Sequence, residues 1–160
     1  MKMVIVGTCI VIFLVVVIFI WGNTLPTTHQ VSTSKAIAVP VSKVWETMSD
    51  WEGQVQWRKD VKSVEIVSAN KFIETPSSGP AVEFEVVRLE RNSIIELKMS
   101  GPFEGEYLAE FSETDGITTI QISETIVQES HVGRIVSALF FDLNDFVDRY
   151  FEQLEKYLKE

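Results

Sequence analysis

The chain begins with an unbroken apolar run and then changes to alternating patterns. Residues 3–21 read MVIVGTCIVIFLVVVIFIW and contain no charged residue and no proline. A helix of this length spans about 28 Å, close to the roughly 30 Å hydrocarbon core of a bilayer. The pattern therefore predicts a single transmembrane helix over residues 1–21.

The length and the end of this run favour a permanent anchor over a cleaved signal peptide. A signal peptide has an apolar core of about 7–15 residues and a small-residue cleavage site, whereas this run is longer and ends in Trp21, a residue type suited to a membrane interface. Cleavage near Gly22, Asn23 and Thr24 stays open as the alternative. Lys2 precedes the run and the next basic residue is Lys35, which favours an extracytoplasmic domain, although one lysine leaves the reverse topology open.

After the run, the hydropathy pattern predicts a spacer and then seven strands. Residues 22–31 are polar and broken by Pro26, which is typical of a spacer before a domain over residues 32–160. Alternating apolar and polar positions predict strands at 34–39, 61–68, 71–75, 81–89, 93–100, 106–113 and 117–127. Asp115-Gly116 is a strong hairpin signal. One apolar face per strand is typical of an antiparallel sheet covered on one side.

Helical patterns stand on both sides of this β-rich region. Pro40 and Ser42 open a first short helix, and Ser49, with Glu52 three residues later, predicts the cap of a second one. Over residues 132–158 the apolar positions recur in steps of three and four behind Ser130, a reasonable N-cap. This predicts one amphipathic helix of about seven turns, roughly 40 Å long, packed on the apolar face of the sheet.

The order of these elements and three short phrases resemble a known superfamily. The phrases are VPVSKVWE at 39–46, SDW at 49–51 and QW at 56–57. They are similar to recurrent phrases in sequences of the START-like, or SRPBCC, superfamily. This superfamily includes lipid-transfer START domains, polyketide cyclases and dehydratases, and activators of the Hsp90 ATPase. The resemblance covers roughly residues 32–160. It implies an α+β helix-grip fold, with a curved antiparallel sheet of about seven strands wrapped around a long C-terminal helix.

The resemblance also implies a cavity between the sheet and the C-terminal helix. Strand phase and helix phase then predict which side chains face it. The candidate lining residues are Val82, Phe84, Val86, Leu97, Met99, Tyr107, Phe111, Ile120, Ile122, Glu124, Leu139, Phe140 and Leu143. Their apolar character predicts a hydrophobic small molecule or lipid as the ligand. A core filled by these same side chains is the alternative.

Charge and motifs limit the chemistry further. The net charge of −9 disfavours a nucleic-acid partner. Cys9 lies inside the apolar run and the histidines are His29 and His131, so the sequence has no metal-ligand spacing, and we expect no metal or cofactor. Arg58 and Lys59 follow Trp57 and form a small basic spot that could meet a headgroup or a carboxylate, although we expect a solvated loop here.

Three classes of function stay open. A binding or transfer domain predicts a cavity that opens near the short helices or residues 101–105, without converging ionisable groups. A cyclase- or dehydratase-type enzyme predicts two polar groups near one point, such as Tyr107 and Glu124, which interrupts an apolar phase. An interaction module predicts a filled core and an unidentified protein partner. We favour the first and assign no catalytic residue, because a membrane anchor places an apolar cavity beside its supply of ligand.

Overall fold

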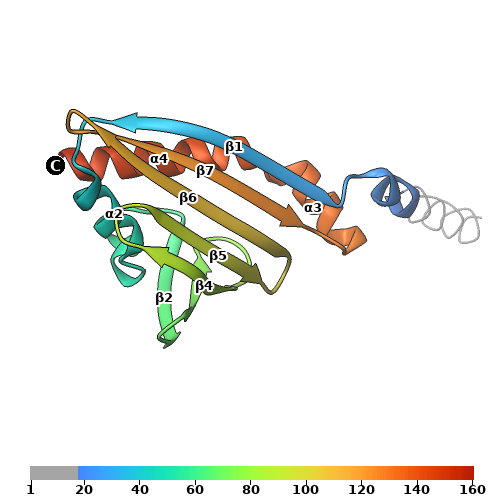
Figure 1. Cartoon of the computed structure of the whole chain (residues 1–160). Coiled ribbons are helices and arrows are strands. Elements are labelled where there is room, and N and C mark those ends of the chain that lie inside the picture. Colours follow the sequence, from blue (N-terminus) through green and yellow to red (C-terminus); the bar gives the residue numbers. More distant parts are fainter. Residues whose placement is uncertain (1–17) are drawn as a thin grey trace, which may run out of the picture.

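The computed structural model describes residues 18–160 and, within them, a single curved antiparallel sheet with helices on one face (Figure 1). The strand order is β1-β7-β6-β5-β4-β3-β2. The strands are β1 (Thr28–Ile37), β2 (Val61–Ser68), β3 (Lys71–Pro76), β4 (Val82–Glu90), β5 (Ile94–Ser100), β6 (Glu104–Thr114) and β7 (Ile117–Val127). The predicted seven-stranded antiparallel architecture is confirmed.

Strand positions follow the alternation closely, except at the first strand. β2 and β7 have the predicted bounds, and β6 and β7 meet at the predicted turn, where Asp115 and Gly116 have φ values of 53° and 75°. β1 begins at Thr28, earlier than predicted and inside the expected spacer. Its register with β7 runs from Thr28↔Val127 to Ile37↔Thr118. Backbone pairing along the full length of β7 therefore extends β1 through a mostly polar stretch, in which Val31 is apolar and buried.

Two short helices follow β1, as predicted: α2 (Val41–Ser49) and the 3₁₀ helix η1 (Glu52–Gln56). The predicted cap at Ser49 is wrong, because Ser49 is the last residue of α2. The Asp50 carboxylate instead accepts a hydrogen bond from the Gly53 backbone N–H at 3.1 Å. A side-chain acceptor does begin this turn, one residue later than the sequence indicated.

The predicted single C-terminal helix is two helices, α3 (His131–Phe140) and α4 (Leu143–Lys159). Ser130 caps α3 as predicted, accepting from the Gly133 N–H. The chain then becomes extended at Phe141, with φ −130° and ψ 117°. The Asp142 carboxylate starts α4 by accepting from the N–H groups of Asn144 and Asp145. This second N-cap is the physical reason for the break.

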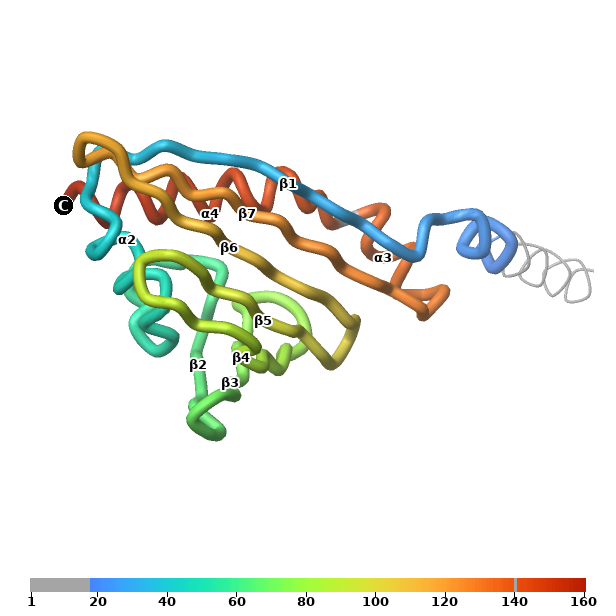
Figure 2. The backbone as a smooth tube through the Cα atoms, in the orientation of Figure 1, coloured from blue at the N-terminus to red at the C-terminus, as the bar shows by residue number. Residues whose placement is uncertain are grey.

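The longer helix, α4, forms the core with the sheet. Its buried residues recur at helical spacing: Leu143, Val147, Phe151, Leu154 and Leu158. They belong to one cluster with buried residues of the strands, among them Ile37, Ile95, Ile120 and Ile122. Figure 2 shows α4 running along β1 and β7, while β2, β3 and β4 curl away from it. The helix-grip arrangement is therefore confirmed, with a gap in the core where the curl is strongest.

Most of the predicted membrane anchor lies outside the described residues. Residues 18–24 are helical and continue toward β1. Within residues 18–160 no helix combines the length and the apolar character needed to cross a bilayer.

Candidate ligand-binding cavity

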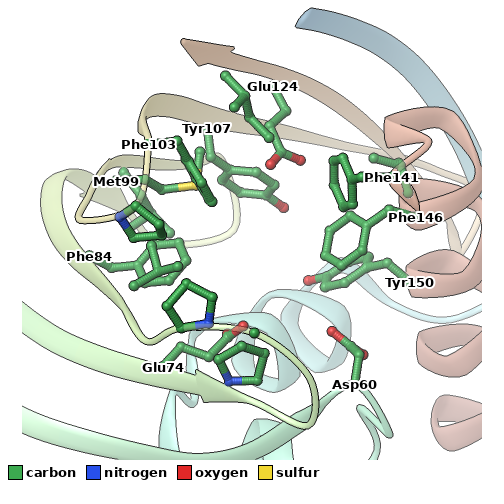
Figure 3. A pocket seen from close by; sticks show the side chains of 18 of the residues that line it. Asp60, Glu74, Phe84, Met99, Phe103, Tyr107, Glu124, Phe141, Phe146 and Tyr150 are labelled. Atoms are coloured by element: carbon green, nitrogen blue, oxygen red, sulfur yellow. The ribbon is translucent and has the colours of Figure 1, made fainter. Parts of the chain in front are cut away.

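A cavity of about 760 Å³ lies between the curled part of the sheet and the helices (Figure 3). Its wall includes Phe84 of β4, Met99 of β5, Tyr107 of β6, and Phe146 of α4. The volume is within the roughly 300–1,000 Å³ of small-molecule sites. A void of this size argues against a core that is filled throughout.

The structure places the predicted lining residues in three groups. The residues that line the cavity are Val82, Phe84, Leu97, Met99, Tyr107, Ile122 and Glu124. The remaining predicted strand residues pack in the solid part of the core, where Phe111 and Ile120 are buried and Val86 is partly buried. Leu143 of α4 is buried there as well. Leu139 is a correction, because its side chain is 56% exposed. The side chain of Phe140 lies outside the described part of the chain.

The error at Leu139 has a physical cause. The apolar stripe over residues 132–158 predicts one straight helix. The break at Phe141 and Asp142 separates the two helices, so a residue of α3 need not share the buried face of α4. Buried positions of α4 keep the predicted phase, whereas α3 turns Leu139 to the surface.

One end of the cavity is polar and is built around Arg58, which is 7% exposed and not solvated as the sequence suggested. Its guanidinium donates to both carboxylate oxygens of Glu74, at 2.7 and 3.1 Å. It also donates to Asp60 at 2.6 Å and to the Gln54 side-chain oxygen at 2.7 Å. Burial disfavours the charged form, but Glu74 and Asp60 outweigh this and raise the pKa of Arg58 above its ordinary value.

Glu124 and Tyr107 lie opposite each other on neighbouring strands and both face the cavity. Glu124 is 6% exposed. Burial raises its pKa from 4.5 to about 7, with Arg58 lowering it and Glu74 raising it by smaller amounts. The Tyr107 hydroxyl is buried without a hydrogen-bond partner among residues 18–160. Both side chains therefore have free hydrogen-bonding capacity inside an apolar space.

Tyr150 of α4 joins the two polar regions. Its hydroxyl points into the cavity toward Tyr107 (Figure 3), and burial raises its pKa above the ordinary value. The Arg58 guanidinium carbon lies 5.5 Å from the Tyr150 ring centre, in cation–π geometry. Ionisable groups thus converge in the cavity, contrary to what we expected of a binding domain and in line with the enzyme alternative.

The cavity opens between the β3–β4 loop and α3. Lining residues that are also exposed mark this mouth: Ser78, Gly79 and Pro80 of the loop, and Val136 and Phe141 on the helical side. Pro102 and Phe103 also line the cavity, and they lie in the segment 101–105, near which a binding domain is expected to open. The Gln128 side chain connects the loop between β5 and β6 to the start of α3. It donates a hydrogen bond to the Pro102 carbonyl and accepts one from the Ser130 N–H.

Within residues 18–160, no group of three His, Cys, Asp or Glu side chains has the spacing to hold a metal ion. His131 instead contacts Asn23, with 2.6 Å between the imidazole Nε2 and the amide oxygen.

The polar end was missed in the sequence, although one signal for it existed. Phe72 and Glu74 occupy the same phase of β3, and both are buried. Strand alternation therefore places Glu74 on the inner face, and a carboxylate there needs a buried partner. No local pattern identifies Arg58, Asp60 or Tyr150 as the partners.

Comparisons with known proteins agree with this architecture. A family model described as "Polyketide cyclase / dehydrase and lipid transport" matches residues 28–158. No curated protein sequence matches significantly. A START superfamily protein from Mycobacterium smegmatis is similar in structure, with TM-score 0.68 and 18% identity over 82% of this chain and 97% of that one.

Two further solved structures extend the comparison. A conserved protein from Geobacillus kaustophilus has TM-score 0.67 and 15% identity, covering 82% of this chain and 95% of its own. DynU16, a protein of the dynemicin biosynthetic locus, has TM-score 0.59 and 19% identity, covering 81% of this chain and 47% of its own. At these identities, the likeness shows the shared fold.

Proposed function

Because the chain belongs to the polyketide cyclase/dehydrase and lipid transport family of START-like domains, we propose that it binds or transfers an apolar small molecule or lipid at a membrane. The cavity of about 760 Å³ carries this proposal. Such a volume equals that of about 25 liquid water molecules. Water is poorly accommodated against walls such as Phe84, Leu97 and Met99, so an apolar occupant that displaces it is favoured.

The anchor supplies the location in this proposal. Residues 1–21 hold the domain to the bilayer as a single pass, with the domain on the extracytoplasmic side. A ligand drawn from the bilayer then travels a short distance to the mouth beside α3. The apolar composition of residues 3–21 and of the cavity wall supports this reading.

The test compares the full chain with two tryptophan variants by native mass spectrometry after extraction in detergent. Val82→Trp places an indole in the cavity, whereas Val87→Trp adds the same group at a position of β4 that is 48% exposed. We expect a bound molecule at one per chain in the parent and in Val87→Trp, and its loss in Val82→Trp. Equal occupancy in all three would refute binding in this cavity.

A second candidate function, catalysis of the cyclase or dehydratase type, is favoured by Glu124. A carboxyl group whose pKa is about 7 exchanges protons efficiently near neutral pH. Its strand neighbour Tyr107 brings a hydroxyl to the same cavity. If the chain is an enzyme, Glu124→Gln purified from cells should carry a bound species that differs in mass from the parent's. A pure binding domain should carry the same species in both.

A further inference from the structure

The charged groups of the cavity wall determine which polar end a ligand can have. They are Arg58, Asp60, Glu74, Glu124 and Arg149. Arg149 is exposed at the surface, and the buried cation of this wall, Arg58, is paired with Glu74 and Asp60. The remaining Nε–H of Arg58 is covered and has no acceptor among residues 18–160. Among the described residues, the buried part of the cavity wall therefore has no unpaired positive charge to neutralise an anionic ligand.

Two groups with unused hydrogen-bonding capacity, Tyr107 and Glu124, lie opposite each other in the described cavity wall. The Tyr107 hydroxyl is buried without a hydrogen-bond partner among residues 18–160. We propose that the bound molecule meets this pair with an uncharged hydroxyl or carbonyl group, and that amphiphiles ending in a carboxylate or phosphate are excluded. This inference rests on the proposed binding function and names its ligand class.

The physical reason is the cost of burying charge. An anionic headgroup at Tyr107 would lose its hydration close to Glu124 and to a cluster whose formal charge is already negative, since Arg58 is matched by both Glu74 and Asp60. A hydroxyl or carbonyl loses less hydration. It accepts a hydrogen bond from Tyr107, and a hydroxyl also bonds with the Glu124 carboxyl in either protonation state.

The test offers the full chain an equimolar mixture of hexadecanol and hexadecanoate at about pH 7.3 and counts the bound species by native mass spectrometry. If hexadecanoate binds only in its protonated form, its apparent affinity falls by at most about a thousandfold. The reason is that the assay pH lies roughly three units above the ordinary pKa of a carboxylic acid. We expect the alcohol to be enriched at least about tenfold, within that limit. Equal binding, or a preference for the acid, would overturn the inference while leaving the binding function intact. Binding of neither, with an empty cavity, would count against the binding function itself.

Paired tyrosine variants test the contact between the ligand and Tyr107. Tyr107→Phe removes a hydroxyl that has no partner among residues 18–160, so the fold should be retained. Its affinity for hexadecanol, measured alone, should fall by about fivefold, the value of one neutral hydrogen bond. Tyr157→Phe removes a surface hydroxyl that donates to Gln56, and it should behave as the parent. An unchanged affinity of Tyr107→Phe for hexadecanol would exclude the assigned contact.

A second, independent inference concerns the outer face of α3. Val132, Val136 and Leu139 are 70%, 50% and 56% exposed, and their spacing of four and three residues places them on one side of the helix. Phe141, directly after the helix, is 45% exposed. An amphipathic helix normally turns such a stripe to the core, so this one lacks a partner within the described domain.

The apolar N-terminal run meets α3 at the same end of the molecule (Figure 1). The Phe19 ring stacks on His131 with centroids 4.9 Å apart, and Asn23 contacts the same imidazole. Gly22 lies so close to α3 that an added Cβ would be 2.9 Å from the Ile135 side chain. These contacts hold the end of the run against the helix.

We infer that the apolar face of α3 lies in the surface of the bilayer that residues 1–21 enter, and that the cavity mouth therefore opens onto the membrane. The occupant is a bilayer because the chain continues from this contact into residues 3–17, which are entirely uncharged. Interfacial helices bury an apolar face about 5–10 Å deep. Val136 and Phe141 are both exposed and part of the cavity wall, so immersion of this face brings the mouth to the lipid.

Spin labels on the full chain in lipid vesicles test this placement, starting from Cys9→Ser. A label at Leu139→Cys should collide more with oxygen, which concentrates in lipid, than with a water-soluble nickel complex. The control Glu152→Cys, on the exposed side of α4, should show the reverse. Equal water accessibility at both sites would overturn the inference. A label at Ile12→Cys separates the two proposals, since water accessibility there would refute the anchor instead.

Discussion

Glu124 should make the domain less stable as the pH rises toward neutrality. Its pKa is about 7 in the folded chain, against an ordinary value of 4.5. Between these values the folded state binds more protons than the unfolded state, so the free energy of unfolding falls as the pH rises, and this contribution is constant above about pH 7. A difference of about 2.5 pH units corresponds to about 3 kcal/mol.

The substitution that tests this is Glu124→Gln, which keeps the shape and removes the titration. Relative to the parent, the variant should gain about 3 kcal/mol of stability between pH 4.5 and pH 8. The measurement is urea unfolding of the detergent-solubilised full chain, followed by tryptophan fluorescence across this pH range. Using the difference between the two proteins cancels the titration of all other groups.

A matched control and a clear refutation are both available. Glu110 lies on the neighbouring strand β6, opposite Gln121, and is exposed. Glu110→Gln should therefore keep the pH profile of the parent. If the stability difference between Glu124→Gln and the parent stayed constant from pH 4.5 to pH 8, the carboxyl group would not be desolvated in the way the structure indicates.

Three further substitutions test individual features of the fold, each by urea or thermal unfolding. Arg58→Met leaves the buried Glu74 without its counter-charge and should cost about 3–5 kcal/mol, most of which the double variant with Glu74→Met should recover; no recovery would contradict the ion-pair argument. Asp142→Ala removes the acceptor for two N–H groups at the start of α4 and should cost about 1 kcal/mol; no loss would mean that packing alone sets the break. Gly116→Ala places a Cβ at φ 75° and should cost about 1 kcal/mol, although no atom crowds the site; a neutral effect would contradict the left-handed turn.

Much of the fold follows from short stretches of sequence. The strand alternation, the Asp115-Gly116 hairpin and the Ser130 cap each depend on residues within a few positions of one another. The same is true of the buried stripe of α4. Such features depend on side-chain period and turn chemistry, which are local, so the α+β order of elements was predictable.

Features that depend on close competition between neighbours were less predictable. Asp142 provides an N-cap inside a continuous apolar stripe, and the break that follows turns Leu139 to the surface. Asp50 takes the role expected of Ser49. In each case two local signals point to different boundaries, and packing against the rest of the domain selects one.

The candidate site was decided by the tertiary structure. From strand phase alone, Glu124 and Tyr107 were singled out, and their register on β6 and β7 places them face to face. Their surroundings depend on Arg58, Glu74 and Tyr150, which come from a loop, an edge region of the sheet and the last helix. The curl of the sheet determines whether these groups meet over an open space or a filled core. That curl depends on contacts between residues far apart in the chain, which no periodicity in a single sequence records.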